Sequence, residues 1–189
     1  MTGPRRRPFV FLDRDGTLIE DREYAHLPAD YAPLPGTYAA VAALRAAGFG
    51  VVVVTNQSGI GRGLFSAADY ADFEALMLRD FAAHGAALDG CYHCPHAPDE
   101  GCACRKPETA LALRAAQEHA IDLARSWVIG DTDLDVALAR NLGSHAVLVR
   151  TGHGERHRIR VPLGTLVARD LAEAVSRYVL ADGATQSAR

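Results

Sequence analysis

The chain has 189 residues, of which 49% are hydrophobic and 23% charged, and its 20 Lys and Arg against 23 Asp and Glu leave a formal net charge of -3. This profile is typical of one globular domain, and it excludes intrinsically disordered and fibrous proteins. Since the chain has no basic excess, no apolar run near the ~20 residues of a membrane span and no secretory signal, we expect a cytoplasmic protein that binds neither nucleic acid nor membranes. We further expect a monomer.

Apolar runs alternate with helical patterns along the chain. The pattern predicts a strand at 8–12, a loop at 27–36, a helix at 37–47, a strand at 50–54, a helix from 66 to about 84, a weaker strand around 88–93, a helix from 107 to about 120, a strand at 126–130, a helix at 133–141, a strand at 145–149 and a last helix over about 170–180. The tail at 181–189 is expected to fray.

Alternating strands and helices of this kind are typical of a three-layer, Rossmann-like α/β sandwich with a mainly parallel sheet. We expect one domain over 1–189, with its core at about 8–150. Residues 17–53 are too few to hold a large inserted cap domain in addition to the predicted helix. In such sheets ligands bind beyond the carboxyl ends of the strands, so the site is expected just after each apolar run.

Polar clusters follow three of these runs. Asp13 and Asp15 follow the first run, and two carboxylates at this spacing can converge on one Mg²⁺. A lone pair of this kind is more often a solvated turn. Thr55 and Asn56 follow the second run and offer donors to phosphoryl oxygens, while Asp131 follows a later run.

Lys106 is the one Lys among the 20 basic residues, and it stands at a predicted helix start. A single Lys in a chain whose other basic residues are all Arg indicates a position that needs a compact ammonium rather than a planar guanidinium. Genomic base composition is an alternative explanation. With Lys106, the set contains metal ligands, phosphate donors, a nucleophile and a cation.

In this order the strings FLDRDGT, VTNQSG, RKP and IGDTDLD resemble the haloacid dehalogenase (HAD) superfamily of aspartate-nucleophile phosphatases. The resemblance implies that Asp13 attacks phosphorus and that Asp15 protonates the leaving oxygen and then activates water. It further implies that Asp13, the backbone carbonyl of Asp15 and Asp131 hold Mg²⁺, and that Thr55 and Lys106 bind the phosphoryl group. Asp135 is expected either to orient the metal's water shell or to serve as an ordinary helix-start residue.

All four cysteines lie between positions 91 and 104, together with His93 and His96. In a chain without a secretion signal this clustering indicates a metal site rather than disulfides. The spacing alone permits either four cysteines or three cysteines and one histidine around a tetrahedral Zn²⁺.

The string CPH, five residues, CxC and RKP is similar to the zinc loop of the HAD subgroup that holds the heptose bisphosphate and histidinol-phosphate phosphatases. This resemblance implies a structural Zn²⁺ on Cys94, His96, Cys102 and Cys104, within a zinc loop at 91–105. Cys91 is then interpreted as a small buried apolar residue.

Two further strings, TNQSGIGRG and REYAH, resemble the heptose enzymes, which implies removal of the 7-phosphate of D-glycero-D-manno-heptose 1,7-bisphosphate. Arg62 and Arg105 are candidates to bind the distal phosphate, with surface charge as the alternative. Histidinol phosphate is the alternative substrate, because the short zinc loop resembles that of the histidinol enzymes at least as well. Its cationic amine would need an acid, for which Glu23 and Asp21 are the candidates. A nucleic-acid 3′-phosphatase and a zinc-stapled binding module without activity are the less favoured interpretations, and the sequence does not define a role for residues 151–169.

Overall fold

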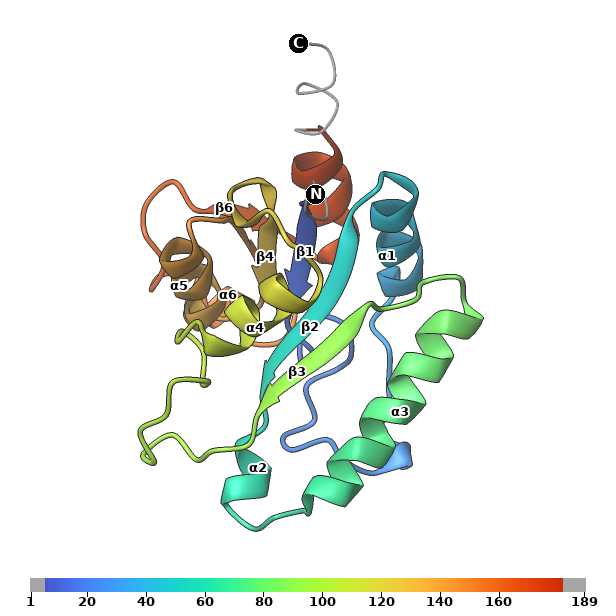
Figure 1. The fold of residues 1–189 in the computed structure, drawn as a ribbon, viewed down its shortest axis with the longest axis vertical. Helices are drawn as coiled ribbons and strands as arrows, with labels where there is room; N and C mark the ends of the chain where they lie inside the picture. The colour runs from blue at the N-terminus through green and yellow to red at the C-terminus, as the bar shows by residue number, and fades with distance from the viewer. Residues whose placement is uncertain (1–5, 182–189) are drawn as a thin grey trace, which may run out of the picture.

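The computed structural model describes residues 6–181 and contains one sheet of parallel strands (Figure 1). These are β1 (Phe9–Leu12), β2 (Gly50–Asn56), β3 (Gly90–Cys94), β4 (Trp127–Gly130), β5 (His145–Val149) and β6 (Leu166–Ala168). Their order is β3-β2-β1-β4-β5-β6, and every neighbouring pair is parallel. The chain therefore leaves β1 at the middle of the carboxyl edge, between the ends of β2 and β4.

Helices cover both faces of the sheet (Figure 1). One face carries α1 (Thr37–Ala46), α3 (Ala67–Ala83) and α7 (Leu171–Ala174), which continues into a π-helix (Val175–Val179), and the other face carries α4 (Ala110–Glu118) and α5 (Asp133–Leu142). The remaining elements are short: α2 (Ser58–Gly61), α6 (Gly154–His157) and the 3₁₀ turns Pro28–Asp30 and Leu123–Arg125. This arrangement confirms the predicted three-layer α/β fold without a large cap domain.

The core consists of one apolar cluster on each face of the sheet. Val10 and Leu12 of β1 belong to the cluster under α1 and α3, whereas Phe9 and Phe11 belong to the cluster under α4 and α5. Because successive side chains of a strand point to opposite faces, a strand buried on both faces must be apolar at every position. That requirement explains the unbroken apolar runs of the sequence.

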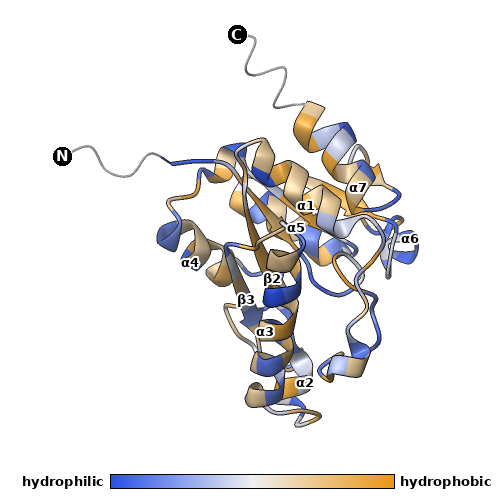
Figure 2. Ribbon diagram, turned by 90° about the vertical axis from the view of Figure 1, so that its right-hand side faces the viewer, coloured by the Kyte–Doolittle hydropathy of each residue, from blue (hydrophilic) through white to orange (hydrophobic). Residues whose placement is uncertain are grey.

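The helix α3 shows why the sequence pattern predicted a helix here. Ser66 Oγ accepts a hydrogen bond from the Asp69 N–H at 3.1 Å, and Asp69 Oδ2 accepts one from the Ser66 N–H at 2.8 Å, which closes a capping box. Its buried residues recur at helical spacing, and Figure 2 colours the helix in alternating hydrophilic and hydrophobic bands. The buried residues are Tyr70, Phe73, Met77 and Phe81.

Four elements differ clearly from prediction. The strand β6 and the helices α2 and α6 were not predicted, because three strand residues and helices of four residues are too short to give a periodic signal. The helix α4 begins at Ala110 rather than at 107, since the Glu108 N–H donates to the Arg105 carbonyl in a turn. The predicted frayed tail lies, beyond Ala181, outside the described residues. Within residues 6–181, every helix is too short or too polar to cross a membrane.

Candidate active site

Three carboxylates meet at the carboxyl edge of the sheet. Asp13 follows β1, Asp131 follows β4, and Asp135 lies in the first turn of α5. One carboxylate oxygen of each lies within 4.8 Å of the others. Thr55 ends up beside them because β2 neighbours β1, and its side chain is buried. The topology therefore brings together residues from three separate segments of the chain.

Two glycines allow the backbone to approach Asp131 closely. A Cβ at Gly16, whose φ is +71°, would lie 2.3 Å from Asp131 Oδ2, and a Cβ at Gly152, whose φ is +55°, would lie 2.2 Å from the same atom. The main-chain N–H of His153 donates to that oxygen at 2.7 Å. A larger residue at either glycine would displace the Asp131 carboxylate.

Lys106 forms a buried ion pair with two of these carboxylates. Its Nζ lies 2.9 Å from Asp13 Oδ1 and 2.6 Å from Asp135 Oδ1, and the side chain is 3% exposed. Burial alone would lower the pKa of Lys106, but the charges of Asp13 and Asp135 raise it above its usual value. Lys106 is therefore a fixed ammonium beside Asp13.

Asn56 holds the main chain of Lys106 from both sides. Its Oδ1 accepts a hydrogen bond from the Lys106 N–H at 2.9 Å, and its Nδ2 donates to the Lys106 carbonyl at 3.3 Å. The end of β2 is thereby tied to the segment that follows the zinc loop.

The carboxylate cluster carries more negative charge than Lys106 offsets. Burial raises the pKa of Asp13 to about 7 although Lys106 opposes the shift, and burial together with the charge of Asp13 raises the pKa of Asp131 to about 8. A cation between these hard carboxylate oxygens would remove the cost of ionising both groups. The donor set thus fits Mg²⁺.

Asp135, for which the sequence left two roles open, is a helix-start residue that also contacts Lys106. Its Oδ2 accepts hydrogen bonds from the Thr132 N–H at 3.1 Å and from the Thr132 hydroxyl at 2.6 Å, while its Oδ1 binds Lys106. It caps α5 and fixes Lys106 with the same carboxylate.

Both oxygens of the Asp15 carboxylate are bound. Arg14 donates from Nε to Oδ2 at 3.0 Å and from Nη2 to Oδ1 at 2.9 Å. Gln57 Nε2 donates to Asp15 Oδ2 at 3.0 Å and to Thr55 Oγ1 at 2.9 Å. Sequence reasoning missed Arg14 and Gln57 as functional residues, because neither stands at a position whose spacing indicates a contact with Asp15.

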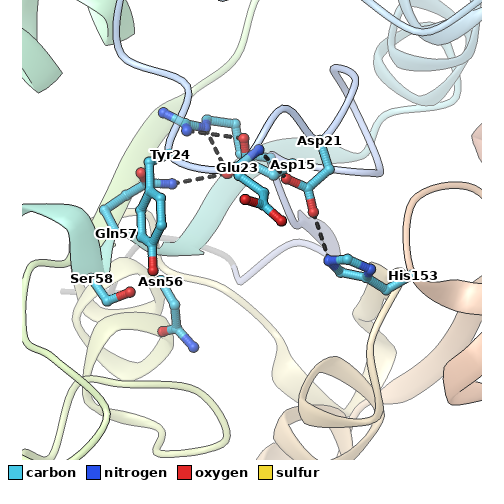
Figure 3. A pocket seen from close by; sticks show the side chains of 9 residues that line it. Asp15, Asp21, Glu23, Tyr24, Asn56, Gln57, Ser58 and His153 are labelled. Atoms are coloured by element: carbon cyan, nitrogen blue, oxygen red, sulfur yellow. Dashed lines mark hydrogen bonds and ion pairs between the residues drawn. The ribbon is translucent and has the colours of Figure 1, made fainter. Parts of the chain in front are cut away.

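A cavity of about 340 Å³ opens beside Asp15 (Figure 3). It is lined by Asp15, Asn56 and Ser58 and, on the opposite side, by Asp21 and His153, whose Nε2 lies 2.8 Å from Asp21 Oδ2. His153 belongs to the segment 151–169, for which no role was predicted. Since its N–H also contacts Asp131, the beginning of that segment forms one rim of the site.

The two arginines predicted to bind a distal phosphate lie outside the lining of this cavity. The Arg62 guanidinium is exposed and lies 6.0 Å from the ring centre of Tyr24, a lining residue. Arg105 is half-buried, and its Nη1 donates to the His96 carbonyl at 3.4 Å. In contrast, Asp21 and Glu23, the acidic alternatives, both line the cavity.

The loop between β3 and α4 gathers a second candidate metal site. The Sγ atoms of Cys94, Cys102 and Cys104 lie 3.1 to 3.6 Å apart, and His96 Nδ1 lies 3.2 Å from Cys104 Sγ. These separations are near the ~3.8 Å edge of a tetrahedron with Zn–S bonds of about 2.3 Å. The sulfur and nitrogen donors fit Zn²⁺.

The thiols of this cluster differ in acidity. Burial opposes ionisation at Cys102, yet the N–H groups of Cys104 and Arg105 lower its pKa to about 7, whereas burial raises the pKa of Cys94 to about 12. Cys91 is outside the cluster, and burial raises its pKa as well. All four cysteines are free thiols in the structure. Cys91 is half-buried rather than buried, and it packs against the apolar cluster under α1 and α3, in agreement with the predicted apolar role.

Comparison with known proteins agrees with the geometry. Residues 103–174 match the family model described as HAD-hydrolase-like. A D-glycero-β-D-manno-heptose-1,7-bisphosphate 7-phosphatase of Pseudomonas putida is 39% identical over 173 residues, which cover 90% of this chain and 98% of that protein. The enzyme of the same name from Yersinia pestis is 43% identical over 154 residues, or 77% of this chain and 81% of that one.

A solved structure of similar shape is that of a D,D-heptose 1,7-bisphosphate phosphatase from Bordetella bronchiseptica, complexed with magnesium and phosphate. It is 36% identical, its TM-score is 0.83, and the match covers 96% of this chain and 99% of that chain.

Proposed function

The chain belongs to the D-glycero-β-D-manno-heptose-1,7-bisphosphate 7-phosphatase family of HAD-like hydrolases, and from that premise we propose that it hydrolyses the 7-phosphate ester of this heptose bisphosphate in an Mg²⁺-dependent reaction. The observation that carries the proposal is the position of the Asp13 carboxylate, which lies 2.9 Å from the Lys106 ammonium and in one cluster with Asp131, while Asp15, two residues further along the chain, lines an open cavity.

Asp13 and Asp15 divide the reaction into two displacements. An oxygen of Asp13 attacks phosphorus, the phosphorus–ester oxygen bond breaks, and Asp15 gives its proton to the leaving oxygen. Asp15 then takes a proton from water, whose oxygen attacks phosphorus, and the bond to Asp13 breaks to release inorganic phosphate. Thr55 and Lys106 hold the phosphoryl oxygens, and Lys106 offsets their charge.

Asp13, Asp131 and the backbone carbonyl of Asp15 would hold Mg²⁺, which neutralises charge on the phosphoryl group and on the carboxylates. The cluster of Cys94, His96, Cys102 and Cys104 would hold Zn²⁺. With four protein ligands that ion has no open position, so its role is to order the loop that ends at Arg105 and Lys106.

Arg62 and Arg105 are the proposed ligands of the distal phosphate, with Arg62 reaching it past Tyr24.

One observation favours a second substrate. The cavity wall carries Asp21 and Glu23, and carboxylates suit the cationic amine of histidinol phosphate.

Initial rates of phosphate release, measured with Mg²⁺ on heptose 1,7-bisphosphate and on histidinol phosphate, decide between the two. We expect kcat/KM to favour the bisphosphate by about 100-fold, which corresponds to about 2.7 kcal/mol of transition-state binding. The reverse preference would assign the histidinol-phosphate activity. The control is Asp13→Asn, an isosteric variant without a nucleophile, and turnover by a folded Asp13→Asn protein would contradict the mechanism.

A further inference from the structure

Arg14, between the two catalytic aspartates, is the largest side chain that the fold buries completely. Its exposed fraction is 1%. A buried guanidinium costs free energy unless hydrogen bonds and an opposite charge compensate it, so its contacts indicate why it is there. Among residues 6–181, Asp15 is the carboxylate with which Arg14 forms an ion pair.

The guanidinium forms a bidentate ion pair with the Asp15 carboxylate. Nε and Nη2 reach the two carboxylate oxygens at 3.0 and 2.9 Å, and Nη2 also donates to the buried Ala25 carbonyl at 3.0 Å. Two parallel hydrogen bonds from a planar group fix both the position and the plane of a carboxylate. Lys could supply the charge at this position but not the plane.

Two aromatic rings of the helix α3 pack against the Arg14 guanidinium. The guanidinium carbon lies 4.9 Å from the ring centre of Phe73 and 5.6 Å from that of Tyr70. Both rings belong to the buried face of α3. The two rings pack against the guanidinium, and the cation–π contact adds to its stability.

We propose that Arg14 is a positioning residue that acts through Asp15. It holds the Asp15 carboxyl group at the cavity, with Gln57 on its other side, in the orientation from which Asp15 reaches the leaving oxygen. The inference rests on the proposed phosphatase function. It assigns Arg14 no contact with the substrate.

A defect in Asp15 has a characteristic signature. A leaving group that is stable as an anion departs without a proton, whereas a basic leaving group needs the general acid. General acid–base catalysis contributes about 10²- to 10⁴-fold, so a misplaced Asp15 slows the second kind of substrate selectively. A merely structural defect in the site slows both kinds alike.

The test compares phenyl phosphate with p-nitrophenyl phosphate, two substrates of similar shape whose leaving groups differ in basicity. For Arg14→Gln we expect kcat/KM to fall about 100-fold on phenyl phosphate and less than about 3-fold on p-nitrophenyl phosphate. Arg14→Lys should recover only part of the loss. The matched control is Arg114→Gln on the exposed face of α4, where Arg114 pairs with Glu118.

Equal losses on both substrates would overturn the inference. So would any further loss when Arg14→Gln is added to Asp15→Asn, since a residue that acts through Asp15 has no effect once its acid is gone. If Arg14→Gln fails to fold, Phe73→Leu loosens the guanidinium instead, and it must show the same selective loss on phenyl phosphate. If the wild-type protein with Mg²⁺ released no phosphate from heptose 1,7-bisphosphate, that result would instead contradict the proposed function itself.

Discussion

A single ammonium group connects the candidate nucleophile to the helix α5. Lys106 contacts Asp13 and Asp135 at once, and a compact point charge fits between two carboxylates where a planar guanidinium would need a wider gap. The arginines of the chain therefore could not replace it. This explains physically why the one Lys of the chain occurs at this position.

Acid–base chemistry at the same cluster predicts a dependence of stability on pH. The pKa values of Asp13 and Asp131 rise from 3.8 to about 7 and about 8 in the folded protein. A carboxyl group whose pKa is higher in the folded than in the unfolded protein stabilises the fold at pH values below its unfolded pKa. This contribution is lost as the pH rises through its folded pKa. In Mg²⁺-free buffer we expect Tm to fall from about pH 4 to about pH 8, and added Mg²⁺ to raise Tm most at the upper end.

Scanning calorimetry across this range, with and without Mg²⁺, checks the prediction. The variant with Asp13→Asn and Asp131→Asn should lose both the slope and the Mg²⁺ effect. A wild-type Tm that does not change with pH would be inconsistent with a strained carboxylate cluster.

Asp13 and Asp131 were predictable because each follows an apolar run, and strand topology places such positions at one edge of the sheet. Arg14 was not predictable in the same way. The sequence shows an Arg between two Asp residues, but an exposed Arg is the ordinary case, and only the packing of α3 buries it. Gln57 likewise depends on the path of the chain after β2.

Secondary-structure elements were predictable where burial or capping dictates the sequence. The predicted helix over 66 to about 84 corresponds to α3 at Ala67–Ala83, and the predicted strand at 145–149 to β5. The strand β6 was missed because it lies at the sheet edge, where its first two residues are not buried and need not be apolar.

The zinc loop gives a prediction at the scale of one element. Cys104→Ala should abolish zinc binding and raise KM about 10-fold, the effect of one lost contact to a charged group, because Arg105 loses its support. The fall in kcat should be smaller, since Asn56 still holds the main chain of Lys106. Native mass spectrometry measures the zinc content, steady-state kinetics measures KM and kcat, and far-UV circular dichroism checks that the secondary structure is retained.

Cys91→Ala is the matched control for this loop, because Cys91 lies outside the cluster and should leave zinc content unchanged. Loss of the sheet signal in Cys104→Ala would show that zinc supports the whole fold rather than the loop alone.

At the scale of the whole molecule, the two apolar clusters share the same strands. Since β1 contributes alternate residues to both, neither cluster can persist without the sheet. We therefore expect the single domain predicted from the sequence to unfold in one cooperative transition.

Urea unfolding followed by two probes tests this. The fluorescence of Trp127, the one tryptophan of the chain and a buried residue of β4, reports the centre of the sheet, and far-UV circular dichroism reports the helices. The two curves should coincide. Separate midpoints would show that the faces of the sheet unfold independently.

The hydrogen bonds of Asn56 to Lys106 have a consequence for protein engineering. They and the end of β3 anchor the zinc loop at both ends, and neither anchor depends on the length of chain between them. We therefore expect the fold to tolerate replacement of this loop by one of another length. A loop of different length grafted between these anchors is expected to alter which molecules the enzyme accepts while the reaction chemistry is retained.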